Sequence, residues 1–167
     1  MASPPPARAY RPVGRAIYHP TLRVGYHPRI GCPIIGSILG ITFGTMYAAT
    51  LDYLLAKEYE IDGYDGSTIY LRNVREMSFN WPDATMYYDD AGQLVGAQFI
   101  YSTSFSSTTR FNRLYNDLCE TYGEPMEVVE EGNLIVSTWY GGDEQGYVTL
   151  EYDYADERYY TILSYGI

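Results

Sequence analysis

The residues best suited to acid–base or nucleophilic chemistry are few, and they lie apart from the folded body that the rest of the chain predicts. Both histidines, His19 and His27, fall in a proline-rich stretch near the start of the sequence. Serine and cysteine nucleophiles need a histidine beside them in the folded body, so neither class of catalytic site is supported. The only lysine, Lys57, follows no phosphate-binding glycine loop. We therefore expect a protein that is not an enzyme, with no catalytic residue and no cofactor.

Carboxylates are the one kind of potential catalyst present in quantity, with 21 Asp and Glu residues. Two of them facing each other across a cleft would suit glycoside hydrolysis. The sequence singles out no such pair, because most of the acids fall in predicted turns or at exposed strand positions. A carboxylate hydrolase acting on envelope glycans is therefore kept as an alternative function.

Metal binding has little support in the sequence. The string at residues 62–67, Asp-Gly-Tyr-Asp-Gly-Ser, places Tyr64 where a calcium loop needs an oxygen ligand. A tight turn containing a glycine with positive φ explains the same string. Two cysteines, Cys32 and Cys119, are too few for a structural zinc site, and they form either one disulfide or two thiols. We expect no metal site.

Aromatic side chains are the strongest functional lead, because the chain contains 20 Tyr, five Phe and two Trp. Aromatic rings stack on sugars and anchor protein interfaces. We predict that the binding surface contains aromatic residues near strand ends: Trp81, Trp139, Tyr140, Tyr147 and Tyr159. The alternative for the two tryptophans is that they fill the core between a sheet and its helices.

Residues 147–154 show the alternation typical of a half-buried strand. One set of positions is Tyr147, Thr149, Glu151 and Asp153, and the other is Val148, Leu150, Tyr152 and Tyr154. If the second set packs in the core, Tyr147 faces outward together with the acids.

Charge divides the chain into an arm and a body. Residues 1–30 contain five Arg and no acid, whereas residues 31–167 contain six basic residues and all 21 acids, a balance of −15. A body this acidic repels nucleic acids and anionic lipid surfaces. Seven of the nine prolines lie in residues 1–33, so we expect residues 1–35 to form an extended or disordered basic arm. Residues 36–167 are expected to form a single domain.

The stretch 30–51 carries no charge and leaves two interpretations open. Small residues recur every four positions at Gly36, Gly40, Gly44 and Ala48, a spacing that lets membrane helices approach closely. Pro33 and several polar residues favour instead a short buried segment, a break at Gly44 and then a helix. A membrane-associated envelope assembly protein that packs through residues 34–51 is the second alternative function.

Two helices are predicted from apolar residues at helical spacing. The first covers residues 45–58, with Thr45 as its N-cap. The second covers residues 107–122 and ends at Gly123 and Pro125, the usual order of helix-terminating residues.

The remaining segments alternate like strands: 68–73, 76–81, 85–88, 94–104, 126–130, 134–140, 147–154 and 158–165. We expect an α+β fold, with a bent antiparallel sheet and two helices on one face. The order also suggests two helix-then-strands halves, at about 44–105 and 106–167.

Four local strings carry a resemblance to a known group of proteins: YLRNV at 70–74, WPDAT at 81–85, FIYST at 99–103, and YGEP at 122–125 with Trp139 downstream. Over residues 36–167 the chain resembles uncharacterised exported proteins of gut Bacteroidetes. The resemblance implies a periplasmic, cell-surface or secreted location and implies no activity. The repeated helix-then-sheet order is similar to that of the β-lactamase inhibitory proteins, whose single unit resembles the outer-membrane assembly lipoprotein BamE. This second likeness concerns topology alone, so inhibition is not carried over.

Taken together, these features predict a non-catalytic extracytoplasmic binding or adaptor protein that uses an aromatic sheet face or an acidic surface. The expected partner is a protein or a glycan of the cell envelope, and no nucleic acid. Membrane association is expected only under the alternative function in which residues 34–51 pack in a membrane.

Overall fold

The computed structural model describes residues 32–143 and 145–167. Residues 1–31 lie outside the described ranges, so the predicted arm is represented only by residues 32–35, and neither histidine is included. The described chain has an α+β fold in which two helices and a two-stranded hairpin accompany a large antiparallel sheet of eight strands. This confirms the predicted fold class.

The chain runs through a short hairpin and then twice through one helix followed by four strands. The elements are β1 (Ser37–Ile38), β2 (Ile41–Thr42), α1 (Tyr47–Ala56), β3 (Glu60–Tyr64), β4 (Thr68–Glu76), β5 (Phe79–Tyr88), β6 (Leu94–Thr103), α2 (Thr109–Tyr122), β7 (Glu127–Glu131), β8 (Leu134–Tyr140), β9 (Tyr147–Ala155) and β10 (Arg158–Gly166).

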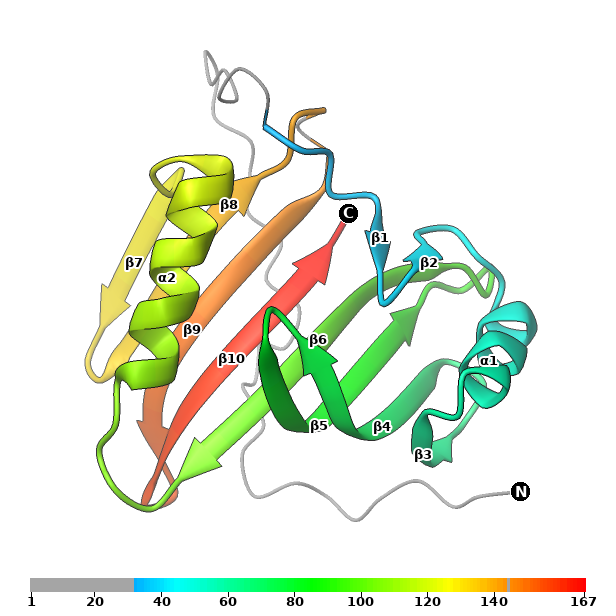
Figure 1. The fold of residues 1–167 in the computed structure, drawn as a ribbon, viewed down its shortest axis with the longest axis horizontal. Helices are drawn as coiled ribbons and strands as arrows, with labels where there is room; N and C mark the ends of the chain where they lie inside the picture. The colour runs from blue at the N-terminus through cyan, green and yellow to red at the C-terminus, as the bar shows by residue number, and fades with distance from the viewer. Residues whose placement is uncertain (1–31, 144) are drawn as a thin grey trace.

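The eight long strands form one continuous sheet in the order β3-β4-β5-β6-β10-β9-β8-β7, with every neighbouring pair antiparallel. Each set of four strands is a meander, and the two meanders meet where β6 pairs with β10. Figure 1 shows that the sheet is curved and that α1, α2 and the β1–β2 hairpin all lie on the same side of it. The opposite face therefore carries no helix of the described chain.

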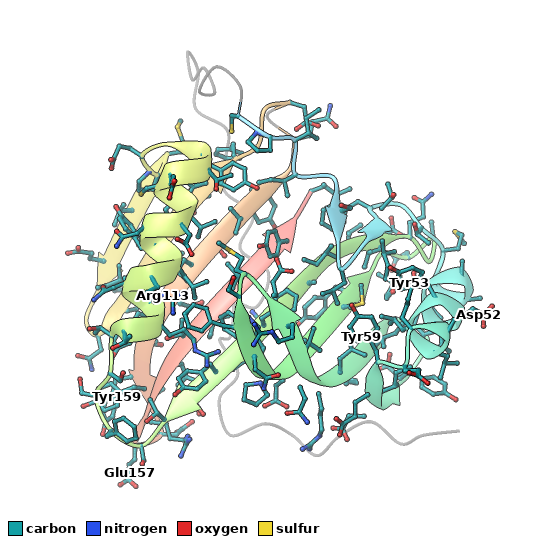
Figure 2. All side chains as sticks on the ribbon, viewed as in Figure 1. Asp52, Tyr53, Tyr59, Arg113, Glu157 and Tyr159 are labelled. Carbon is teal, nitrogen blue, oxygen red and sulfur yellow. The ribbon has the colours of Figure 1, made fainter. Side chains whose placement is uncertain are left out.

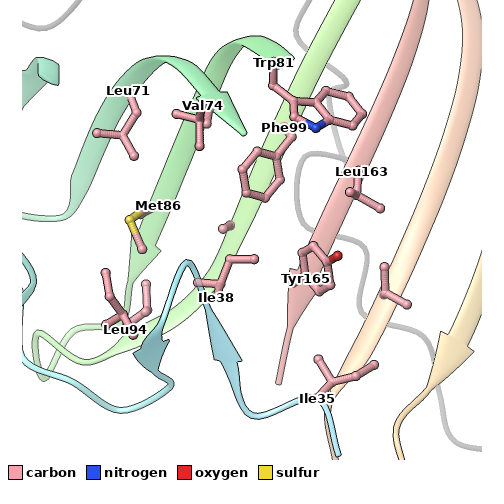
Figure 3. Close-up of a cluster of buried hydrophobic side chains, with 14 of the residues drawn as sticks. Ile35, Ile38, Leu71, Val74, Trp81, Met86, Leu94, Phe99, Leu163 and Tyr165 are labelled. Carbon is pink, nitrogen blue, oxygen red and sulfur yellow. The ribbon is translucent and has the colours of Figure 1, made fainter. Parts of the chain in front are cut away.

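The main core lies between the sheet and these three elements (Figure 3). Leu54 of α1 and Leu114 and Leu118 of α2 are buried in it, as is Ile38 of the hairpin. Burial of such apolar side chains stabilises the fold by about 1.5–3 kcal/mol each. The core is continuous from one half to the other, because Phe99 of β6 packs beside Tyr165 of β10.

Residues 34–51 form the hairpin and the start of α1 rather than one long helix. Gly44, with φ of 92°, separates the two parts, as the non-membrane interpretation predicted. No helix within the described ranges is long and apolar enough to cross a membrane.

The first helix differs from its prediction in two details. It starts at Tyr47 with Met46 at the N-cap, and no side chain caps it, because the Thr45 hydroxyl donates instead to the Thr42 carbonyl at 2.7 Å. Leu55 falls at the apolar spacing that predicted this helix, but 59% of its surface is exposed, because the short helix buries only Thr50 and Leu54 fully.

Candidate functional site

The sheet face without helices is the candidate site, and contacts to α2 determine which residues belong to it. The Phe111 ring of α2 lies 5.6 Å from the Tyr152 ring of β9, and the Tyr115 ring lies 5.6 Å from Trp139 of β8. Tyr152 and Trp139 therefore point towards α2. Since successive strand residues point to opposite faces, their neighbours Glu151, Asp153 and Thr138 point to the other face.

The strand register arranges that other face in rows that cross the sheet. The polar row is Thr85, Gln98, Ser164, Thr149 and Thr138, one residue from each of five neighbouring strands. The row beside it is Asp83, Ile100, Ile162, Glu151 and Val136. The third row contains Ser102, Tyr160 and Asp153. We call these three rows together the helix-free face.

The helix-free face is buried even though neither helix nor the hairpin covers it. Ile162 is fully buried, and only 4% of Glu151 and 7% of Asp153 are exposed. Ile100, Tyr160 and Ile162 form a small apolar cluster separate from the main core. The face therefore combines an apolar centre with buried acidic and hydroxyl groups.

Two buried carboxylates and a half-buried one, Asp83, give the face its electrostatic character. Removing a carboxylate from water is costly unless cationic or hydrogen-bond-donating groups surround it. One oxygen of Asp153 accepts a hydrogen bond from its neighbouring backbone, Tyr154 N, at 2.8 Å. At one edge of the face, Arg158 Nε donates to Ser102 Oγ at 2.9 Å. These three carboxylates make this part of the helix-free face acidic.

The polar row supplies hydrogen-bonding groups beside the carboxylates. Gln98 Nε2 donates to Ser164 Oγ at 3.4 Å. Thr138 Oγ1 is buried and has no hydrogen-bond partner among the residues that the structure describes. Because buried hydroxyls are normally hydrogen-bonded, Thr138 is a position where a bound polar group could form a hydrogen bond.

Tyr140 and Tyr147, both predicted as binding residues, lie opposite each other at one end of the helix-free face. Both are buried, which differs from the expected exposed rings. The Tyr147 ring lies over Gly166, where an added Cβ would come within 2.5 Å of the Tyr147 hydroxyl. Burial raises the pKa of Tyr147 well above its ordinary value. Tyr147 faces the same side as Glu151 and Asp153, as the alternation predicted.

The two tryptophans lie in the main core, so their assignment to a binding surface is corrected. Trp81 is fully buried and Trp139 is 1% exposed. Their indole N–H groups donate to the carbonyls of Glu76 and Gly123, at 3.0 and 2.9 Å. Figure 3 shows Trp81 beside Phe99 in the core. These side chains stabilise the sheet–helix interface instead of contacting a ligand.

Tyr159 lies away from the other four residues. Its ring is 4.7 Å from the Tyr154 ring and belongs to the helix side of the sheet, at the end of the molecule labelled in Figure 2. The five predicted residues therefore do not form one surface. The acids of the helix-free face were not named as binding residues, although the alternation of residues 147–154 was the available signal.

The structure also bears on the metal and disulfide questions. Within the described ranges, no group of three or more His, Cys, Asp or Glu residues is placed to hold a metal ion. In the 62–67 string, Asp65 Oδ1 accepts hydrogen bonds from the backbone of Ser67 and Thr68, and Gly66 has φ of 94°. The string thus ends in a tight turn. Cys32 and Cys119 are thiols and are not joined in a disulfide.

The geometry defines an α+β protein with an acidic, hydroxyl-lined sheet face. No protein-family model, curated protein or solved structure matches the chain.

Proposed function

We propose that this protein is a non-catalytic, extracytoplasmic binding or adaptor protein, and that its helix-free face binds an extended, cationic segment of an envelope protein. The observation that carries the proposal is the burial of Glu151 and Asp153 on a sheet face without helices. The extracytoplasmic location is proposed on the resemblance of residues 36–167 to exported proteins. The absence of a histidine from residues 31–167 supports a non-catalytic role.

An extended segment containing arginine and proline matches the groups of the face. A guanidinium donates several hydrogen bonds in one plane, so it can contact a carboxylate and a threonine hydroxyl together. Arginine and proline also pack on tyrosine rings, which Tyr140, Tyr147 and Tyr160 provide. A glycan partner has less support, because both tryptophans are in the core.

The test uses a fluorescein-labelled synthetic peptide of alternating arginine and proline, titrated with the full chain. We expect binding that weakens at least about tenfold in the double variant Glu151→Gln, Asp153→Asn, because charge-assisted hydrogen bonds contribute roughly 1.5–3 kcal/mol each. The matched control is Asp52→Asn, Asp117→Asn, which removes two exposed carboxylates from α1 and α2. Figure 2 shows Asp52 at the outer end of the molecule, on α1.

The control variant should bind the peptide as the unmodified chain does. An equal loss of affinity in both double variants would mean that net charge alone attracts the peptide, and it would contradict a site on the helix-free face. Failure of every chain to bind the peptide would contradict the proposed function itself.

A further inference from the structure

The described chain begins at the edge of the helix-free face, where residues 32–35 pack against a loop that contains three glycines. An added Cβ at Gly141, Gly142 or Gly146 would come within 2.0–2.6 Å of the backbone of residues 32–35. Gly142 N donates to the Pro33 carbonyl at 2.8 Å. Side chains at these three positions would collide with the segment, so the loop fixes where it passes.

This loop joins β8 to β9 beside Tyr140, which lies at one end of the helix-free face. Cys32 Sγ lies 3.7 Å from the Tyr140 carbonyl oxygen. Residue 31, the last of the undescribed segment, is therefore joined to the body at the rim of that face.

The sequence of residues 1–31 complements the chemistry of the face. It contains five arginines, six prolines and no acid. The face contributes carboxylates at Asp83, Glu151 and Asp153, with tyrosines at one end. Residues 1–31 therefore have the cationic, proline-rich composition that the proposed function requires of a partner.

The segment is also long enough to reach across the face. Eight strands about 4.8 Å apart span roughly 34 Å, whereas 31 extended residues reach up to about 100 Å. Because the segment is tethered at the rim, its effective concentration at the face is on the order of millimolar.

We propose that residues 1–31 are the resident occupant of the helix-free face, and that an external partner binds by displacing them. This inference rests on the proposed function, because it assigns the regulation of the same site. With the arm as occupant, the apparent affinity for a partner equals the intrinsic affinity multiplied by the fraction of chains whose face is open.

The experiment compares two triple variants of the full chain in the arginine–proline peptide titration. The arm variant is Arg15→Gln, Arg23→Gln, Arg29→Gln. The matched control is Lys57→Gln, Arg75→Gln, Arg113→Gln, which removes three exposed positive charges from the body. We expect the arm variant to bind the peptide about tenfold more tightly than the unmodified chain, and the control to bind it unchanged.

Equal affinity in the arm variant, the control and the unmodified chain would overturn the arm as an occupant while leaving the proposed function intact. If none of the three binds the peptide, the proposed function fails, and the inference fails with it. These two failures are therefore distinguishable.

A second readout uses limited trypsin digestion, since trypsin cleaves after arginine only where the chain is accessible. We expect cleavage after Arg15 and Arg23 to be several-fold slower in the unmodified chain than in the Glu151→Gln, Asp153→Asn variant. The rate is measured at two protein concentrations. Protection that increases with concentration would overturn binding within one chain and indicate exchange of arms between two copies.

Discussion

Glu76 at the end of β4 turns its side chain into the core, where the Tyr165 hydroxyl donates to its Oε2 at 2.7 Å. Burial raises the pKa of the Glu76 carboxyl, although the hydrogen bond from Tyr165 partly opposes this. Burial, followed by the nearby Glu76, also raises the pKa of Tyr165. Burial therefore favours the protonated form of Glu76.

The sign of the pH dependence follows from the raised pKa. The stabilising contribution of Glu76 is complete below the pKa of the unfolded chain and is lost as the pH rises through the folded-state pKa. Glu76→Gln keeps a hydrogen-bond acceptor for Tyr165 and cannot ionise. We expect the free energy of unfolding of this variant, relative to the unmodified chain, to increase between pH 4 and pH 7, measured by urea denaturation.

The matched control is Glu130→Gln, which removes an exposed carboxyl from β7. A pH trend that is the same for Glu130→Gln and Glu76→Gln would contradict the assignment to the buried carboxyl.

At the scale of elements, Arg110 joins α2 of the second half to the strands of the first. Its guanidinium carbon lies 3.8 Å from the centroid of the Tyr101 ring and 4.7 Å from that of Phe79. Its Nη1 also donates to the Asn80 carbonyl at 2.6 Å. Arg113, one turn further along α2, contacts only the Phe79 ring among these groups, at 5.0 Å.

We expect Arg110→Ala to lower the free energy of unfolding by about 2–3 kcal/mol, because a partly desolvated cation–π contact and a hydrogen bond are both lost. Arg113→Ala should cost less than about 1 kcal/mol. Chemical denaturation of both variants checks this, and equal effects would contradict a specific role for Arg110.

The elements with strong periodicity could be predicted from the sequence, and those governed by unusual turns could not. α2 and β8 agree closely with their predictions, because apolar stripes and flanking glycines mark them clearly. The predicted break between strands 76–81 and 85–88 is wrong, because β5 runs unbroken from Phe79 to Tyr88. The chain turns instead at Met77 and Ser78, which adopt positive φ without glycine.

Pro82 lies inside β5, where it needs no hydrogen-bond donor towards β6, since pairing with β6 begins at Asp83. β3 was also missed, because Gly63 and Asp62 suggested a turn, whereas the strand continues through a bulge between Ile61 and Gly63. The candidate face depends on which side of the sheet the helices cover, and a local alternation pattern alone cannot supply that information.

At the scale of the whole molecule, the sheet makes the two halves one structural unit. β6 and β10 pair over eight residues, and the core continues across them. Each half also contains one buried tryptophan, Trp81 in β5 and Trp139 in β8. Loss of either meander would expose the central strands of the other.

We therefore expect a single cooperative unfolding transition. In the variants Trp81→Phe and Trp139→Phe, the remaining tryptophan reports on one half only. Within each variant, the denaturant midpoints from tryptophan fluorescence and from far-UV circular dichroism should coincide. Fluorescence midpoints that depart from the circular dichroism midpoint would show that the halves unfold separately.

β10 is the last strand along the chain and lies in the middle of the sheet, between β6 and β9. A ribosome therefore delivers the first meander and three strands of the second before the strand that joins them. Until β10 emerges, β6 and β9 present open backbone edges that can pair with other nascent chains. The edge of β6 stays open from residue 103 until β10 begins at residue 158, and a premature stop codon before β10 would remove the seam of the whole sheet.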